Sequence, residues 1–364
     1  MKKYFFYIFL LFSLSIEAQT EPFKIVLDAG HGGKDPGKVH KKIYEKDIVL
    51  KIILLLGKEL EKDPLFKVIY TRRDDHFIEL YERGAIANKA KADLFVSVHC
   101  NSSPSKDAHG SESYVLGLHV NDINFEVAKE ENQVIFLEKD YKERYAGYDI
   151  NSPESFIGLS IMQEEYLEQS IQAAKRVQSS LAENTQRRDR GVKQAGFIVL
   201  HQTYMPAMLI ETGFLSNQEE RDYLNSAAGQ QQIASSIVKA IKSYYNWLKN
   251  NSQLSKEAVA AANGDLFYRI QIATSNKDLP AVPSNFKGLS PILKEKIGNA
   301  FRYYYGKETD LKKIENLLQL AKKKGFTDAF IVTFIRGKRA NWKSEKWRMK
   351  SEKLTTRINS RKQL

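Results

Sequence analysis

Ile25-Val26-Leu27-Asp28-Ala29-Gly30-His31-Gly32-Gly33-Lys34-Asp35-Pro36-Gly37 joins a short apolar run to a loop rich in glycine. The apolar run begins at Phe23 and predicts a buried strand, whereas the glycines and the proline predict a loop. This loop presents one histidine, His31. A carboxylate, Glu45, follows at the point where the next helix is expected to begin.

Two later segments have the same layout. Residues 93–99 form an apolar run that ends in a histidine, and residues 207–213 form an apolar run that leads into a glutamate. In an open parallel sheet, the carboxyl ends of the strands border one crevice in which ligands bind. We therefore expect four polar side chains to converge there: His31, Glu45, His99 and Glu211.

This set of side chains has the chemistry of a zinc hydrolase. Two imidazoles and one carboxylate, here His31, His99 and Glu45, make a catalytic set for one Zn²⁺ and leave a fourth position open. Glu211 would then be the general base. Simpler roles are available to each residue taken alone: a strand-end histidine can be a structural hydrogen-bonding group, Glu45 can favour the start of a helix, and Glu211 can be an ion-pair partner.

The order of the predicted elements indicates an α/β fold with a mostly parallel, twisted sheet flanked by helices. Helices are predicted where apolar residues recur at helical spacing, and strands where short apolar runs end at turn residues. The expected strands are residues 23–27, 66–71, 94–99, 111–116, 197–200 and 207–210, and the expected helices are residues 45–60, 78–91, 160–183 and 230–248.

Four motifs carry a resemblance to a known family: residues 28–33, 45–47, 97–101 and 210–217. In this order they resemble the zinc-dependent N-acetylmuramoyl-L-alanine amidases of the cell wall, of amidase type 3, over residues 22–248. The resemblance implies hydrolysis of the amide between the lactyl group of N-acetylmuramic acid and the L-alanine of the peptidoglycan stem peptide. It implies that zinc polarises the carbonyl and activates water, with Glu211 as the base.

Four further residues are candidates for supporting roles. Asp28 and Asp47 could orient the ligating histidines, or could cap a turn or a helix. Arg83 could bind a carboxylate of the stem peptide, although an ion pair with Glu79 on the helix surface is favoured. Asn101 could bond the substrate backbone or stabilise a turn.

Residues 119–156 differ in composition from the rest of this domain and are interpreted as an insertion beside the site. A solvated helix is expected near residues 124–137. In some members of the family that the chain resembles, a helix inserted here blocks the zinc until a protein activator moves it. That resemblance makes Glu126, Glu130 and Glu131 candidate autoinhibitory carboxylates. The favoured alternative is a solvated surface excursion or a wall of the substrate groove.

The N-terminus predicts export. Residues 1–18 are interpreted as a signal peptide, because Lys2 and Lys3 precede an apolar core that is too short to span a bilayer stably. An uncleaved anchor is the alternative. We expect the periplasm of a Gram-negative bacterium as the location. The single cysteine, Cys100, excludes an internal disulfide and is expected to be a small core residue.

The C-terminal third is predicted to be a linker, residues 249–265, and a small α+β domain, residues 266–339. This domain partly resembles the SPOR domains, which bind glycan strands stripped of peptides. Its segments 267–272, 301–306 and 325–332 fit that pattern, but residues 278–291 carry three of the nine prolines and give little support for its first helix. A basic tail, residues 340–364, is expected to follow.

The net charge of +12 suits a polyanionic partner such as the cell wall. Nucleic acid is not expected, because the chain is predicted to be exported. The sequence also carries no phosphate-binding loop and no dinucleotide fingerprint. The sequence therefore predicts a peptidoglycan amidase that acts in cell-wall turnover and daughter-cell separation. Two alternatives stay open: a catalytically silent peptidoglycan-binding protein, and another zinc peptidase of the wall.

Overall fold

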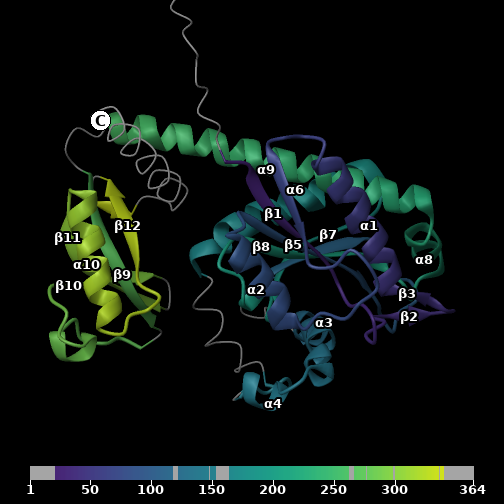
Figure 1. The fold of residues 1–364 in the computed structure, drawn as a ribbon, viewed down its shortest axis with the longest axis horizontal. Coiled ribbons are helices and arrows are strands. Elements are labelled where there is room, and N and C mark those ends of the chain that lie inside the picture. Colours follow the sequence, from purple (N-terminus) through teal and green to yellow (C-terminus); the bar gives the residue numbers. More distant parts are fainter. Residues whose placement is uncertain are drawn as a thin grey trace, which may run out of the picture.

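The structure is a computed structural model that describes residues 21–117, 122–146, 148–152, 164–261, 266–275, 277–297, 300–335 and 337–339. The predicted signal peptide and the basic tail lie outside the described residues. These ranges form two units, each built on its own sheet (Figure 1). No helix among the described residues is both long and apolar enough to cross a membrane.

The first unit has a six-stranded sheet in the order β4-β1-β5-β8-β6-β7. The four strands β4, β1, β5 and β8 are parallel to one another, whereas β6 is antiparallel to β8 and parallel to β7. This largely parallel sheet confirms the predicted fold class. The strands are β1 (Phe23–Ala29), β4 (Phe66–Tyr70), β5 (Leu94–Asn101), β6 (Ser111–Leu116), β7 (Asp189–Ala195) and β8 (Ala207–Phe214).

Helices cover both faces of this sheet (Figure 1). One face packs against α1 (Glu45–Leu60), α6 (Glu164–Thr185) and α9 (Ala227–Ala261). The other face packs against α2 (Leu80–Ala90), α3 (Asp122–Asn132) and α7 (Ile198–His201). The bounds of α1 are those predicted from its apolar spacing, and α8 (Gln218–Leu224) was not predicted.

The face beneath α2 and α3 changes character along its strands. Val26, Phe95 and Leu209 are apolar and buried in the middle of β1, β5 and β8. Two residues further on, side chains on the same face are polar, because alternate residues of a strand share a face. These polar residues at the strand ends are Asp28, Ser97 and Glu211.

Several predictions for the first unit are wrong. Residues 197–200 were expected to be a strand, but the short helix α7 occupies most of them. The segment 124–137 was expected to be a solvated helix. Instead α3 is followed by a 3-10 helix, Gln133–Leu137, and both contribute buried residues. Helix α9 continues to Ala261 and so extends over most of the expected linker, which stays a prediction. Strand β7 was not predicted.

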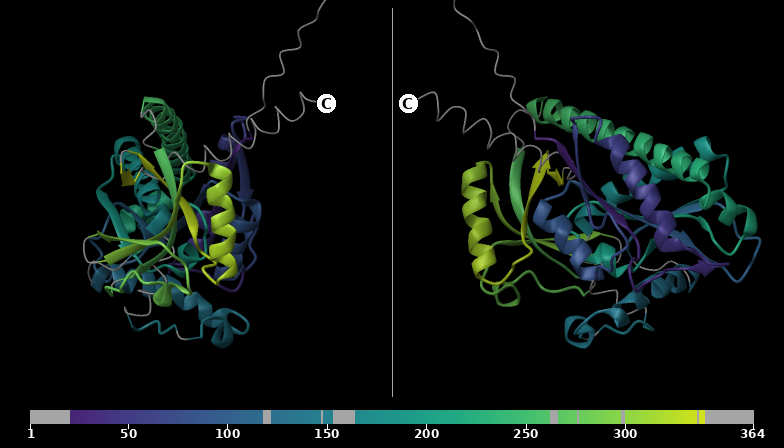
Figure 2. Two further views of the ribbon diagram at one scale, coloured as in Figure 1. Left: turned by 90° about the vertical axis from the view of Figure 1, so that its left-hand side faces the viewer. Right: turned by 45° about the vertical axis from the view of Figure 1, so that its right-hand side comes forward.

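The second unit is an antiparallel sheet in the order β10-β11-β9-β12-β13, with α10 on one face (Figure 2). A short 3-10 helix, Pro283–Phe286, stands where a first helix had little support. The segments 267–272 and 301–306, which fit the SPOR pattern, lie in β9 and β11. The elements are β9 (Leu266–Ser275), β10 (Ile292–Ile297), β11 (Ala300–Glu308), α10 (Leu311–Lys323), β12 (Phe330–Ile335) and β13 (Lys338–Arg339).

Candidate active site and metal centre

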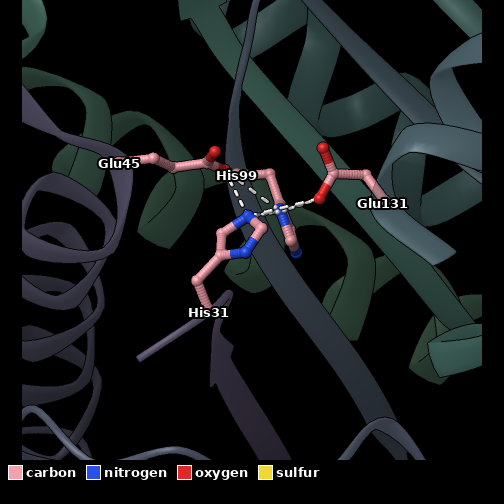
Figure 3. A group of neighbouring side chains, drawn as sticks. All are labelled: His31, Glu45, His99 and Glu131. Atoms are coloured by element: carbon pink, nitrogen blue, oxygen red, sulfur yellow. Dashed lines mark hydrogen bonds and ion pairs between the residues drawn. The ribbon is translucent and has the colours of Figure 1, made fainter. Parts of the chain in front are cut away.

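Four side chains meet beyond the carboxyl ends of β1 and β5 (Figure 3). Each offers one donor atom, and these atoms all lie within 4.8 Å of one another. Each of the four side chains is buried. They are His31 from the loop after β1, Glu45 from the first turn of α1, His99 from β5 and Glu131 from α3.

The shortest distances in this group are close to those within a metal coordination shell. Glu45 Oε1 lies 3.0 Å from His31 Nε2 and 3.1 Å from His99 Nδ1, and the two imidazole nitrogens are 3.1 Å apart. Ligand atoms placed tetrahedrally at about 2.0–2.2 Å from zinc would be separated by about 3.3–3.6 Å. Small shifts of the side chains would therefore accommodate an ion, and the donor set of two imidazoles and carboxylates suits zinc.

Two buried arginines fix the loop that carries His31. Arg72 donates to the carbonyls of Ala29 and Gly30, at 3.0 and 2.8 Å, and Arg83 donates to those of Ala29 and His31, both at 2.7 Å. These bonds occupy the backbone acceptors of a segment in which His31 has a positive φ of 62°. A non-glycine residue in this conformation is held there by its surroundings.

Asp35 orients the His31 imidazole. Its Oδ2 atom lies 2.8 Å from His31 Nδ1 and can accept a hydrogen bond from a proton on that nitrogen. Nε2, which faces the other ligands, then keeps the lone pair that can bind a metal. The second oxygen of Asp35 accepts from the backbone N–H of Gly37 at 3.1 Å. Sequence reasoning missed Asp35, although an acidic residue four positions after the histidine was a signal that could have found it.

Glu45 is held from both sides. Oε2 accepts from the backbone N–H of Lys38 and Oε1 from that of Cys100, each at 2.8 Å. Burial opposes the charged form of this carboxylate, but neighbouring His31 outweighs it and lowers the pKa of Glu45 to about 2. Glu45 is therefore anionic, as a metal ligand must be.

Burial by itself would lower the pKa values of both imidazoles. The surrounding carboxylates reverse this effect, so the pKa of His31 is raised well above its usual value and that of His99 to about 9. A bound dication would balance the charge of these carboxylates and leave the imidazoles neutral, as metal ligands must be.

Glu211 lies beside this group on the neighbouring strand. It is paired in register with His99 across β5 and β8, so the two side chains emerge on the same face of the sheet. Glu211 is buried, and neither of its carboxylate oxygens has a hydrogen-bond partner among the described residues. Burial, together with the charge of Glu131, raises the pKa of Glu211 well above its usual value. A buried carboxylate without partners is unusual in a native protein and points to a functional role.

The sequence of this chain matches a known protein family. The model of the N-acetylmuramoyl-L-alanine amidase family matches residues 25–243. That span contains the six-stranded sheet, except for the first two residues of β1, and all of the side chains described above. The chain belongs to the N-acetylmuramoyl-L-alanine amidase family.

Two relatives, AmiC and AmiB, agree with this assignment. The chain is 35% identical over 232 residues to the N-acetylmuramoyl-L-alanine amidase AmiC of Escherichia coli O6:H1, a match that covers 62% of this amidase but only 54% of AmiC. It is 30% identical over 337 residues to the probable amidase AmiB of Haemophilus influenzae. This match covers 86% of this chain and 73% of AmiB. A solved amidase from Clostridium difficile 630 is 28% identical, with a TM-score of 0.48, over 62% of this chain and 98% of its own.

The supporting residues of the amidase differ from those expected. Asp28 does not contact either histidine; it accepts from Thr71 Oγ1 and Ser97 Oγ, both at 2.6 Å, and pairs with Arg83 at 2.8 Å. Asp47 is exposed in the first turn of α1 and orients neither imidazole. The expected roles of Asp28 and Asp47 in orienting the histidines are therefore wrong.

The predictions for Arg83 also need correction. Arg83 is 1% exposed and points into the amidase, where its guanidinium donates to Asp28 and to backbone carbonyls. It does not pair with Glu79, whose partner is Arg144, and it cannot reach a substrate carboxylate at the surface. Asn101 is buried and donates to Glu112 at 2.8 Å.

The insertion contributes one carboxylate to the amidase site. Glu131 Oε2 lies 3.2 Å from His31 Nε2 and 3.2 Å from His99 Nδ1. Glu130 is half exposed and pairs with Lys38, and Glu126 is exposed. A solvated surface excursion does not describe α3, because this helix buries Glu131 against the two histidines. The other form of the favoured alternative, a wall of the substrate groove, stays a prediction.

Proposed function

We propose that this chain is a zinc-dependent amidase that hydrolyses the amide between the lactyl group of N-acetylmuramic acid and the L-alanine of the stem peptide. One observation carries the proposal: nitrogen atoms of two imidazoles and an oxygen of Glu45 lie 3.0–3.1 Å from one another, beside a buried carboxylate that has no hydrogen-bond partner among the described residues. The family to which the chain belongs indicates the substrate, which is peptidoglycan.

His31, Glu45 and His99 would hold the zinc. Bound zinc supplies a Lewis acid that polarises the scissile carbonyl and makes water a better nucleophile. Asp35 keeps the His31 ring in one orientation, and the backbone N–H groups of Lys38 and Cys100 keep Glu45 in place. The ligands therefore need little rearrangement before substrate binds.

Glu211 is proposed as the general base. Its position next to His99 puts the carboxylate at the edge of the ligand group, and its lack of partners leaves both oxygens available. It would accept a proton from the attacking water and pass that proton to the amine that leaves as the peptide departs. Burial makes the protonated form of Glu211 accessible between these two transfers.

We propose that the insertion regulates access to this site. The Glu131 carboxylate occupies the side of the ligand group that faces α3 and would fill the fourth position around zinc. Lys38 supports it through ion pairs with Glu130 and Glu131. In this arrangement, substrate can reach the site only after α3 moves, and a protein activator would be the partner that moves it.

The cellular role that we propose is cell-wall turnover and daughter-cell separation in the periplasm of a Gram-negative bacterium. The second unit, with one helix packed on a five-stranded sheet, is proposed as a SPOR-like module that binds peptide-free glycan. This activity would hold the amidase on the wall.

The test is digestion of purified sacculi by the zinc-loaded chain, with Glu211→Gln as the matched variant. Release of intact stem peptides and peptide-free glycan by the wild type alone would support the reaction and the base. Shortened peptides that stay on glycan would identify a different zinc peptidase. If the wild type and Glu131→Gln both bind zinc and neither releases peptides, the chain is a silent peptidoglycan-binding protein.

A further inference from the structure

A buried carboxylate next to Glu211 pairs with two cationic side chains that have no role in the proposed reaction. Glu112 on β6 is 2% exposed and is paired in register with Glu211 across β6 and β8. Its Oε2 atom accepts from Arg190 Nε at 2.7 Å and from Lys193 Nζ at 2.5 Å. Both cations come from β7, which lies at the edge of the sheet.

The other oxygen of Glu112 is already satisfied. Oε1 accepts from Asn101 Nδ2 at 2.8 Å and from Tyr114 Oη at 2.7 Å. Glu112 therefore offers no further acceptor to its cations, and its single negative charge faces two positive ones. Burial opposes the charge of Glu112, but Lys193 and Arg190 outweigh it and keep the pKa of Glu112 below its usual value. The group has a net positive charge.

The cations are only partly covered. The Arg190 and Lys193 side chains are 24% and 22% exposed, whereas Glu112 behind them is buried. Arg190 lies over the ring of Phe214, 4.8 Å from its centroid, and contacts Glu112 through Nε. Among the described residues, no hydrogen bond from the two Nη atoms of Arg190 is found. A guanidinium that is held through Nε leaves its two Nη atoms available, and these match the two oxygens of a carboxylate.

The chemistry of the substrate indicates what this edge would bind. The glycan portion of peptidoglycan presents hydroxyl and N-acetyl groups, whereas the stem peptide carries free carboxylates. The position of Glu112 in register with Glu211 places the cations beside the residue that acts on the scissile amide. Arg83, which the sequence suggested for this task, is buried and engaged by Asp28.

We propose that Arg190 and Lys193, held by Glu112, form a subsite that binds a carboxylate of the stem peptide. The inference rests on the proposed amidase reaction for the identity of the substrate. The subsite would determine which stem peptides are accepted, and it would act on substrate binding. Amidation of the peptide carboxylates, which removes their charge, would then weaken binding.

The test compares two soluble muropeptides that differ only in having free or amidated stem-peptide carboxylates. The zinc-loaded full chain and its Arg190→Gln variant are assayed on both, each also in a Glu131→Gln background. We expect Arg190→Gln to raise KM for the free-carboxylate substrate by about ten- to a hundredfold, with little change in kcat, because a charge-assisted hydrogen bond is lost. The preference of the wild type for the free carboxylate should largely disappear.

Two further variants sharpen the result. Arg188→Gln removes the same charge from an exposed position just before β7 and should keep the wild-type preference. Arg190→Lys should keep part of the wild-type preference, because lysine keeps the positive charge but lacks the paired donors of the guanidinium. Equal losses on both substrates in Arg190→Gln, or the same loss of preference in Arg188→Gln, would overturn the subsite.

A binding measurement separates this inference from the reaction itself. Titration calorimetry with the free stem peptide, unmodified or amidated, reports the subsite without turnover. Weaker binding of the unmodified peptide by Arg190→Gln would support the subsite even if no muropeptide were cleaved. Equal affinity of wild type and Arg190→Gln for that peptide would refute the subsite even if the amidase reaction were established.

Discussion

The Asp35 carboxylate lies 2.8 Å from Nδ1 of His31 and fixes the ring of a residue whose backbone is itself in the left-handed region. We predict that Asp35→Ala lowers the affinity for zinc by about ten- to a hundredfold, because the imidazole loses its orientation and some of its basicity. Competition with a chromophoric chelator measures this affinity directly. Asp47→Ala removes an exposed carboxylate from the following helix and is the matched control. Equal losses in the two variants would show that general charge, and not this contact, governs binding.

The proposed block by the insertion gives a second prediction. Glu131→Gln should increase the rate at which the full chain releases peptides from sacculi several-fold, because the neutral amide is a poor zinc ligand. Lys38→Met should act in the same direction, since it removes the cation that pairs with Glu130 and Glu131. Hydrogen exchange over residues 122–132 should rise in both variants.

Glu126 provides the control for this experiment. It lies on the same helix, α3, but is exposed. Glu126→Gln should leave the release rate and the hydrogen exchange of α3 at their wild-type values. If all three variants behave like the wild type while zinc is bound, α3 is a wall of the substrate groove and not a block.

The parts of the fold that could be predicted are those in which the apolar pattern is strong. Helix α1 has apolar residues at helical spacing over its whole length, and its bounds were predicted from that spacing. Strand β7 was missed because its sequence, Asp189–Ala195, is polar and lies at a sheet edge with only one strand beside it. Residues 197–200 were mistaken for a strand, because four apolar residues in a row have no distinct period.

Some residues of the candidate site could also be predicted from the sequence, whereas others could not. His31, His99 and Glu211 lie together because each follows an apolar run at the same edge of the sheet, and topology places such positions side by side. The contact of Asp35 with His31 also requires the left-handed backbone at His31, which the four-residue spacing does not predict by itself. Glu131 could be distinguished from Glu126 and Glu130 only by the rotation of α3 about its axis.

The close packing of Gly30 against His99 gives a further prediction. A Cβ atom added there would lie 2.4 Å from Cε1 of His99, so the imidazole would have to move. We predict that Gly30→Ala lowers zinc affinity at least tenfold, since displaced ligands are costly in metal sites. Gly191→Ala, where no atom lies within 4 Å of the added Cβ, should keep zinc binding and lose only about 1 kcal/mol of stability from its positive φ. Unchanged zinc affinity in Gly30→Ala would contradict the packing described here.

The buried pair of Asp28 and Arg83 should make the stability of the amidase depend on acid pH. Burial opposes the charge of Asp28, but Arg83, Ser97 and Thr71 outweigh it and lower its pKa. The folded protein therefore binds this proton less readily than the unfolded chain does. The contribution of Asp28 to stability is complete above the ordinary carboxyl pKa of about 3.9 and is lost as the pH falls through the lower, folded-state value.

Urea unfolding between pH 6 and pH 3, with a chelator present throughout so that metal release does not contribute, measures this dependence. Asp28→Asn should be less stable than the wild type at pH 6, and the difference should shrink as the pH falls, because only the wild type loses a carboxylate contribution. Arg83→Met leaves Asp28 charged and buried without its cation, so it should cost about 3–5 kcal/mol at pH 6. Because protonation then relieves the uncompensated charge, part of this cost should be recovered at low pH. A constant difference between wild type and Asp28→Asn across the range would exclude Asp28 as a source of the pH dependence.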